Sequence, residues 1–452
     1  MAAVRIMRAA DLFAGPNGSC MPMLAAWSRS TCTLGGAVML ALVNGVVAAI
    51  EEALRRVPED LDVAVLTDGG EQALLCWGRA QPVRELAELN QFAVGSAEPA
   101  AVGWPRQLTG GALVQLDYEF PVGAWAGNPA STSVRGHALP VEHRLEWKGS
   151  CWHGSAASEA AFDQWPARSV SAMPVDAGIA PGMNEQQHAE RVARIKRWIS
   201  AGDIYQANLT LPFTTALTRE HAPAVFTRLL ESAPGVHSAL FRLRDRVVVS
   251  HSPECMVRSD GRWCWSEPIK GTRPRYPGSE ASTRAELLAA AKDNAELAMI
   301  VDLVRNDLGR IARPGGVRVV DPAVVMDLPY VHHLVARVRC ELADGITATD
   351  IIQAVYPAGS ITGAPKIRAM QILRELELAE RGAYCGGIGW IGGGGACVLS
   401  VAIRTLVFTQ QGGRFDAGGG IVADSEAGEE WAEVMAKASA MRRALGETAD
   451  AR

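Results

Sequence analysis

A carboxylate and an amine lie near the two ends of one short segment, His251–Arg273. Of the side chains in this segment, Glu254 could donate a proton and Lys270 could attack as a nucleophile. An equally simple interpretation is that both are solvated surface charges, because Lys and Glu side chains are usually exposed. The segment alone leaves both interpretations open.

A predicted β-hairpin positions this pair. Cys255–Arg258 and Arg262–Ser266 have the composition of strands, and the Ser-Asp-Gly sequence between them supplies the backbone conformations of a tight turn. Pro268 should end the hydrogen-bonded ladder, and Gly271 should free the backbone. We therefore expect Lys270 to lie on a loop at the end of a strand, where a rigid hairpin can present it.

The composition is that of a globular protein without a nucleic-acid partner. The chain has 452 residues, nearly half of them apolar, and a net charge of −5. This length exceeds one ordinary small core, and the charge provides no basic surface for nucleic acid. The nine cysteines show no CxxC pair and no zinc-type spacing. Reduced thiols are therefore expected, and with them a cytoplasmic location.

One apolar run, Leu34–Ile50, is a candidate membrane segment. It is shorter than the ~20 residues that a span needs and continues directly into charged residues, so we predict a buried helix and no membrane association. Met1–Ser30 lacks the order of charged, apolar and small residues that defines a signal peptide. From about Asp62 to Asp176 the pattern predicts short strands separated by Gly and Pro.

A predicted helix carries an acidic pair in its first half. Thr283–Glu286 fits a capping box that opens a helix running to about Leu308. Asp293 and Glu296 are three residues apart on it and therefore share a face. Such a face, considered alone, is more typical of a solvated surface than of a binding site.

The last helix, predicted to begin at Glu430, carries a second acidic pair. Glu430, Glu433 and Lys437 lie within about 60° of one another around its axis. Two such helices together could surround a Mg2+ ion, which prefers carboxylate, water and substrate oxygens and takes few protein ligands.

Several longer strings resemble those of the chorismate-utilising enzymes. PIKGT at 268–272, AELAMIVDLVRND at 295–307, GSITGAPK at 359–366 and GGGIVADSEAGEEWAEVMAKA at 418–438 are similar to strings typical of this family. The likeness is strong over about Gln186–Leu445 and loose before it. It implies an N-terminal portion, residues 1–180, that resembles anthranilate synthase component I, and a chorismate-binding catalytic domain, residues 186–447. The implied fold class is α+β: two large, mainly antiparallel sheets form a sandwich with helices outside and the pocket between the sheets.

The resemblance also assigns ligand-binding residues. It implies that Glu296, Glu430 and Glu433 face a Mg2+ ion. Chorismate carries two carboxylates, so its site needs fixed positive charge and backbone donors. Arg404 is expected on a strand, Val398–Phe408, although the family usually has an acidic residue where Val398 stands. The substrate contacts that the resemblance implies are Thr272, Ser360, Gly363, Tyr384, Arg404, Gly420 and Lys437.

The lysine in PIKGT resembles the aminodeoxychorismate synthase component I branch of the family. That likeness implies that neutral Lys270 attacks C2 of chorismate while Glu254, its pKa raised by burial, protonates the leaving C4 hydroxyl. Ammonia then adds at C4 and expels the lysine, which yields 4-amino-4-deoxychorismate for p-aminobenzoate and folate biosynthesis. His333 would face the substrate ring, although a lone histidine is usually structural.

Three alternatives compete with this hypothesis. An anthranilate synthase usually has alanine where Lys270 stands. A water-adding, isochorismate-forming relative has a lysine base where this chain has Gln206, in a predicted strand over Asp203–Thr210; a glutamine cannot deprotonate water. A non-catalytic ligand-binding protein would bind chorismate without turnover.

The chain has no glutaminase of its own by sequence. No GxCxGxQ-type nucleophile turn is present. The resemblance therefore implies a separate glutamine amidotransferase subunit as the source of ammonia.

Overall fold

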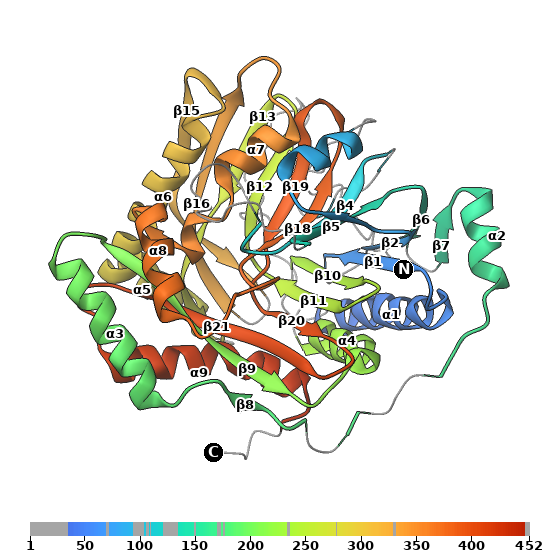
Figure 1. The fold of residues 1–452 in the computed structure, drawn as a ribbon, viewed down its shortest axis with the longest axis horizontal. Helices are drawn as coiled ribbons and strands as arrows, with labels where there is room; N and C mark the ends of the chain where they lie inside the picture. Colours follow the sequence, from blue (N-terminus) through green and yellow to red (C-terminus); the bar gives the residue numbers. More distant parts are fainter. Residues whose placement is uncertain are drawn as a thin grey trace, which may run out of the picture.

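The computed structural model describes residues 35–447, with gaps at 69–71, 94–103, 105–107, 109, 121–133, 149–150, 170–172, 175–176, 233–235, 277 and 329–330. Two large antiparallel sheets pack face to face, and most of the helices lie on their outer faces (Figure 1). The predicted α+β sandwich is confirmed. The leader Met1–Ser30, for which no signal peptide is predicted, lies outside the described residues.

The first sheet has the strand order β17-β9-β21-β20-β11-β10-β1-β2-β6-β7, with β8 also paired to β9. Strands from before and after residue 186 are neighbours in it, because β1 pairs with β10. Its strands are β1 (Asp62–Thr67), β2 (Gln72–Gly78), β6 (His143–Lys148), β7 (Cys151–Gly154), β8 (Ala180–Pro181), β9 (Gln206–Thr215), β10 (His237–Arg242), β11 (Val247–Ser252), β17 (Gly363–Ala364), β20 (Thr405–Phe408) and β21 (Gly413–Ile421).

The second sheet has the order β14-β16-β13-β12-β19-β18-β4-β5-β3, with β15 also paired to β16. Here β4 pairs with β18, so both halves of the chain contribute to this sheet as well. Its strands are β3 (Gln81–Val83), β4 (Ala112–Leu116), β5 (Gly136–Pro140), β12 (Cys255–Asp260), β13 (Trp263–Glu267), β14 (Ile269–Pro274), β15 (Ala312–Asp327), β16 (Val331–Leu342), β18 (Gly387–Ile391) and β19 (Ala396–Val401).

Helices cover the outer faces of the two sheets (Figure 1). On the first sheet, α4 packs against β11 and α9 against β21; on the second, α6 packs against β15 and β16. The helices are α1 (Gly35–Arg56), α2 (Ala156–Gln164), α3 (Glu185–Ser200), α4 (Ala222–Ser232), α5 (Glu280–Ala289), α6 (Ala291–Gly309), α7 (Ala348–Val355), α8 (Lys366–Leu376) and α9 (Ala427–Ala444).

Successive side chains along the strands of the first sheet point to opposite faces, so each face of the sheet has its own apolar core. In β1, Val63 and Val65 point into the core beneath the helices, whereas Ala64 and Leu66 point into the core between the sheets. Trp390 of the second sheet lies in that same middle core. Successive strand residues point to opposite faces, so a strand buried on both sides is apolar at every position.

The apolar run near the start of the chain forms α1. Its residues Val46, Ile50 and Ala53 are buried in the core of the first sheet, and α1 packs on α4. Within the described residues, no helix combines the length and the apolar composition that crossing a membrane would require.

The predicted hairpin is confirmed. β12 and β13 pair antiparallel, and the turn between them contains Gly261 with a φ of 89°. Arg262 and Trp263 donate backbone N–H groups to the Asp260 carboxylate at 2.8 and 2.6 Å, which closes the turn. The helix α3 is opened by a capping box between Asn184 and Gln187.

The single helix predicted from Thr283 to Leu308 is wrong. The chain forms α5 and α6 instead, separated by Ala290, whose backbone is extended with φ −66° and ψ 103°. The Asn294 amide donates to the carbonyl oxygens of Leu288 and Ala290, both at 2.9 Å, and so satisfies the end of α5. The last helix also begins earlier than predicted, at Ala427 rather than Glu430.

The strand predicted over Val398–Phe408 is wrong as well. β19 ends at Val401 in the second sheet, and β20 begins at Thr405 in the first. Arg404 lies in the link that crosses between the sheets, with a φ of 50°. A non-glycine residue in this left-handed region costs conformational energy and is held there by its surroundings.

Candidate active site

The predicted nucleophile Lys270 lies where β9 and β21 of the first sheet face β14 of the second. Lys270 lies on β14, Gly420 on β21 and Gln206 at the start of β9. A Cβ built on Gly420 would lie 2.5 Å from Gln206 Nε2 and 3.5 Å from Lys270 Nζ. The three elements therefore meet around the lysine amine, and the missing side chain of Gly420 leaves the space for it.

Lys270 is part of a strand, so its predicted place on a loop is wrong. It pairs with Leu334 of β16, and the register shifts at the next residue, Gly271, whose φ is 64°. A Cβ on Gly271 would lie 2.9 Å from Asp293 Cγ, so this bulge packs closely on α6. The bulge changes the direction of β14 immediately after the lysine.

The Lys270 amine is paired with a carboxylate. Its Nζ lies 3.3 Å from Glu296 Oε2, and the two side chains are only 13% and 16% exposed. Asp293, on the same face of α6, accepts instead from Arg273 at 3.1 Å. The predicted nucleophile and one predicted metal ligand are thus in direct contact with each other.

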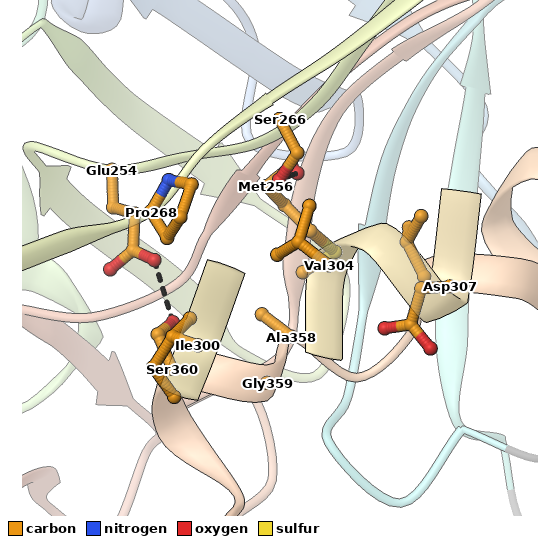
Figure 2. A pocket seen from close by; sticks show the side chains of 11 residues that line it. Glu254, Met256, Ser266, Pro268, Ile300, Val304, Asp307, Ala358, Gly359 and Ser360 are labelled. Carbon is orange, nitrogen blue, oxygen red and sulfur yellow. Dashed lines mark hydrogen bonds between the residues drawn. The ribbon is translucent and has the colours of Figure 1, made fainter. Parts of the chain in front are cut away.

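Glu254 is a buried acid held by the hydroxyl of Ser360. It lies between β11 and β12, and its Oε1 accepts from Ser360 Oγ at 2.6 Å (Figure 2). Ser360 belongs to a short 3-10 turn, Gly359–Ile361. Burial raises the pKa of Glu254 to about 7, because it outweighs the opposing effects of the Ser360 hydroxyl, the Lys270 charge and the backbone of Ile269. A carboxyl with that pKa is partly protonated at neutral pH and can donate a proton.

A small cavity of about 20 Å³ separates Glu254 from a second buried acid, Asp307 (Figure 2). The side chains of Ile300, Val304 and other apolar residues line it, which leaves room for about one water. Lys366 Nζ donates to Asp307 Oδ2 at 2.6 Å. This lysine of the GSITGAPK string is therefore bound to protein, not directed at a ligand.

His333 and Thr272 contact each other on adjacent strands. Thr272 Oγ1 lies 2.8 Å from His333 Nδ1. Burial, with a contribution from the Arg404 charge, lowers the pKa of His333 to about 3, so the ring is neutral at pH 7. Its Nε2 has no hydrogen-bond partner among the described residues. The neighbouring His332 is bound to Asp327 at 2.6 Å.

Glu430 and Glu433 converge on Gly419. A Cβ at Gly419 would lie 3.2 Å from Glu430 Oε2 and 3.7 Å from Glu433 Oε1. Glu430 Oε1 accepts from Ser425 Oγ at 2.6 Å, whereas Oε2 is buried without a hydrogen-bond partner in the described part of the chain. Burial raises the pKa of Glu430. For Glu433 burial acts in the same direction, but the charges of nearby lysines, Lys437 foremost, outweigh it and lower the pKa.

These carboxylates have the chemistry of a Mg2+ site. The unpartnered oxygen of Glu430 and the adjacent Glu433 carboxylate are the hard donors that this ion prefers. No three His, Cys, Asp or Glu side chains of the described residues form a ready-made metal cluster. Any Mg2+ here would therefore take the rest of its shell from water, substrate or a rearranged Glu296.

The two predicted cations differ in what surrounds them. Burial lowers the pKa of Arg404, and no carboxylate of the described residues lies close enough to its guanidinium to oppose that effect. Lys437 is half exposed, donates to the Gly418 carbonyl at 3.0 Å and lies 2.6 Å from Glu433 Oε1. Arg404 is available for an anion as it stands, whereas Lys437 is already paired.

Three further residues lie in the strands and the core around the site. Gln206 is fully buried, and neither its Oε1 nor its Nε2 has a partner among the described residues. Gly363 permits β17 to approach β9, because a Cβ there would lie 2.2 Å from the Gln206 carbonyl oxygen. Tyr384 packs in the apolar core of the second sheet, and no contact among the described residues links its side chain to Lys270 or to the glutamates above.

Two buried ion pairs near the site, Lys366–Asp307 and Glu377–Arg381, are not predicted from the sequence. Lys366 and Asp307 are 59 residues apart, and no local pattern connects them. Glu377 and Arg381 pair at a separation of four residues, with a distance of 2.7 Å. A separation of four residues is typical of an ion pair on a helix, although the segment between Glu377 and Arg381 is not a regular helix.

Comparisons with known proteins point the same way as the geometry. A family model described as chorismate binding enzyme matches residues 76–443. Aminodeoxychorismate synthase component 1 of Salmonella typhimurium is 41% identical over 257 residues, which is 56% of this chain and 56% of that protein. Anthranilate synthase component 1 of Streptomyces coelicolor is 39% identical over 296 residues, 64% of this chain and 57% of that protein. The chain thus spans little more than half the length of these relatives.

A solved structure extends the likeness beyond those alignments. Anthranilate synthase component I from Streptococcus pneumoniae superposes with a TM-score of 0.66 and 26% identity. The superposition covers 84% of this chain and 89% of that one. The match therefore includes strands from both halves of the sandwich.

Proposed function

Because the chain belongs to the family of chorismate binding enzymes, we propose that it is an aminodeoxychorismate synthase component I. It converts chorismate and ammonia to 4-amino-4-deoxychorismate. One observation carries the proposal. The Lys270 amine lies where β14, β9 and β21 meet, close to Gln206 and Gly420 and within the electrostatic reach of Glu254.

Glu254 and Lys270 divide the first half of the proposed reaction. The neutral Lys270 amine bonds to C2 of the ring, and the C4–O bond breaks as Glu254 delivers a proton, so that the hydroxyl leaves as water. The new secondary ammonium returns one proton to Glu254. The raised pKa of Glu254, about 7, suits an acid that must release and regain a proton near neutral pH.

Ammonia completes the second half. It bonds to C4, the Nζ–C2 bond breaks, and the proton that the incoming nitrogen loses goes to the departing lysine. The balance is chorismate and ammonia in, and 4-amino-4-deoxychorismate and water out.

The ion pair between Lys270 and Glu296 has to open before the amine can attack. At 3.3 Å the Glu296 carboxylate is in direct contact with the amine. Glu296, Glu430 and Glu433 would hold a Mg2+ ion, as the orphaned oxygen of Glu430 suggests. When bound, that ion supplies charge stabilisation for a substrate carboxylate. Turning toward the ion would move Glu296 away from Nζ.

The remaining residues bind and orient the substrate. The partly buried Arg404 guanidinium, with no carboxylate of the described residues against it, suits one chorismate carboxylate. His333 is neutral and held by Thr272 through Nδ1, so its free Nε2 can accept or donate one hydrogen bond according to its tautomer. Thr272 thereby fixes the ring orientation.

Ammonia is proposed to come from a separate glutamine amidotransferase subunit, with p-aminobenzoate and folate synthesis as the pathway. The similarity to aminodeoxychorismate synthase component 1 supports this assignment. Free ammonium should replace that subunit in vitro at high concentration.

Anthranilate synthase is the second candidate, favoured by the similarity to the Streptomyces and Streptococcus proteins. Lys270 argues against it. Incubation of the purified chain with chorismate, ammonium and Mg2+ tests the choice through the identity of the product. Our proposal expects an amino-substituted chorismate that retains its enolpyruvyl group, with no pyruvate released. Anthranilate and pyruvate in equal amounts would overturn it.

A further inference from the structure

A fully enclosed arginine, Arg381, joins the elements that surround the active site. Its Nη1 donates to the Ile361 carbonyl at 2.8 Å, and its Nη2 donates to the Asn208 carbonyl at 2.7 Å. Nη2 and Nε also bind the Glu377 carboxylate at 2.7 and 2.9 Å. The residue is 3% exposed. All five N–H directions of a guanidinium are fixed in one plane, so these contacts fix the relative positions of the groups that accept them.

The carbonyl groups that Arg381 binds belong to catalytic elements. Ile361 directly follows Ser360, the hydroxyl donor to Glu254. Asn208 lies two residues after Gln206 and directly opposite Gly420 in the β9–β21 register. One guanidinium therefore connects the Ser360 turn of the acid pocket to the strand pair that faces Lys270.

The surroundings of Arg381 keep it in place. Its guanidinium lies 4.4 Å from the centre of the Tyr118 ring, and its backbone N–H donates to Glu119 Oε1 at 2.7 Å. Glu377 in turn accepts from the Thr210 hydroxyl at 3.0 Å, which adds a second connection to β9. A buried charge with this many partners has one arrangement, because each lost bond leaves a buried polar group unpaired.

We propose that Arg381 is a positioning residue for the acid, which holds Ser360 against Glu254 by fixing the Ser360 turn to β9. The inference rests on the proposed function only in naming Glu254 as the proton donor. Among the described residues, no hydrogen bond or ion pair joins the Arg381 side chain to Glu254 or Lys270; it binds Glu377 and the Ile361 and Asn208 carbonyl groups. Its action on the acid passes through the Ile361 carbonyl and the adjacent Ser360.

The electrostatic consequence has a definite direction. The Ser360 hydroxyl donates to the charged form of Glu254 and lowers its pKa, as do the Lys270 charge and the Ile269 backbone. Asp307, which lines the same cavity as Glu254, is paired with Lys366. If Ser360 moves away, the charged carboxylate loses its hydroxyl donor, and the acid holds its proton to higher pH.

Two substitutions test the connection through the pH dependence of chorismate turnover. Ser360→Ala removes the hydroxyl, and Arg381→Lys keeps the charge but cannot make the planar set of bonds. Each should move the alkaline limb of kcat toward higher pH, by about one pH unit for S360A. The double variant should show no further shift beyond S360A, because both changes act through the same hydrogen bond.

A matched control separates positioning from general stability. Arg246 forms another partly buried pair, with Asp117 at 3.0 Å, and its side chain binds Gln115 and Asp117 rather than the Ser360 turn. Arg246→Lys should lower the thermal stability and leave the alkaline limb where it is. Glu377→Gln provides a second route to the Arg381 contacts should R381K fold poorly. It should shift the limb in the same direction as R381K.

A direct titration of Glu254 makes the result independent of the reaction catalysed. Carboxyl-labelled glutamate gives a carbon NMR signal for Glu254, assigned by its loss in Glu254→Gln. Its midpoint should rise in S360A and in R381K but not in R246K. An unchanged midpoint in folded R381K, or additive shifts in the double variant, would overturn the positioning role. Failure of the proposed function would appear separately, as a product other than 4-amino-4-deoxychorismate.

Discussion

The two ends of the candidate site are organised in opposite ways. At the acid end, Glu254 accepts from the neutral Ser360 hydroxyl and has a cavity of about 20 Å³ beside it. At the amine end each lysine is paired: Lys270 with Glu296 at 3.3 Å and Lys437 with Glu433 at 2.6 Å. Under the proposed function the acid end needs no rearrangement, whereas the amine end exchanges partners when an anionic substrate binds.

This difference follows from desolvation. A buried carboxyl without a cation in contact remains partly protonated, and the raised pKa of Glu254 is that effect. Partly buried amines and carboxylates instead satisfy one another until a better partner binds. Variants at the acid end should therefore change proton donation, and variants at the amine end should change the affinity for metal or substrate.

Glu254→Gln should have the largest effect of the variants at the acid end. Glutamine keeps the shape of the side chain but has no proton to donate, so kcat should fall by about 10²–10⁴-fold with little change in KM. Steady-state turnover of chorismate with saturating ammonium measures this. Glu267→Gln, which alters a carboxylate bound to Arg337 at 3.1 Å, is the control and should retain most activity. An equal loss of kcat in E254Q and E267Q would mean that Glu254 is not the specific proton donor.

Glu433→Gln should act through the metal at the amine end. Loss of one charged ligand should raise the Mg2+ concentration for half-maximal activity by roughly 10–100-fold, and excess Mg2+ should restore part of the rate. Glu429→Gln, on the exposed side of the same helix, is the matched control and should leave the Mg2+ requirement unchanged. A similar Mg2+ requirement in E433Q and the wild type would contradict the assignment.

The alkaline side of the pH dependence should report the acid end. Only protonated Glu254 donates, and its pKa is about 7. With the Lys270 amine neutral, as its attack on C2 requires, activity should fall about tenfold per pH unit well above 7. The profile of kcat between about pH 5.5 and 9 shows whether activity falls as the pH rises. Activity that rises through this range without a decline would mean that Glu254 is not the donor.

Two adjacent glycines should give the smallest and most local effects. Gly420→Ala places a methyl group 2.5 Å from Gln206 Nε2 and 3.5 Å from Lys270 Nζ, whereas Gly419→Ala places one 3.2 Å from Glu430 Oε2. We expect G420A to lower kcat about tenfold, and G419A mainly to raise the Mg2+ requirement a few-fold. Titrations of each variant with Mg2+ and with chorismate separate the two results. The reverse pattern would exchange the functions assigned to these two positions.

Local signals in the sequence predicted the elements that depend on neighbouring residues. The Asp-Gly turn predicted the β12–β13 hairpin, and the helical period of α9 brought Glu430 and Glu433 to one side. The family strings predicted the α+β sandwich. No short-range pattern of residues could show that Arg404 lies where the chain crosses between sheets.

Long-range pairing explains the remaining differences. Lys270 was expected on a loop because Pro268 and Gly271 interrupt a strand pattern, but β16 pairs with this segment and a bulge at Gly271 absorbs the irregularity. The break at Ala290 was missed because alanine favours helix, and the capping amide of Asn294 comes only four residues later. The buried contacts of Arg381 depend on segments 20 and 173 residues away.

The most direct test of the account concerns the Lys270 amine. Rapid mixing of the purified chain with chorismate and Mg2+ in the absence of ammonia should leave an adduct on Lys270 with the mass of chorismate minus water, detectable in the intact protein and in the peptide that carries Lys270. Lys270→Ala should form no adduct and should lose nearly all production of 4-amino-4-deoxychorismate. An undiminished rate of that product from Lys270→Ala would contradict the central claim.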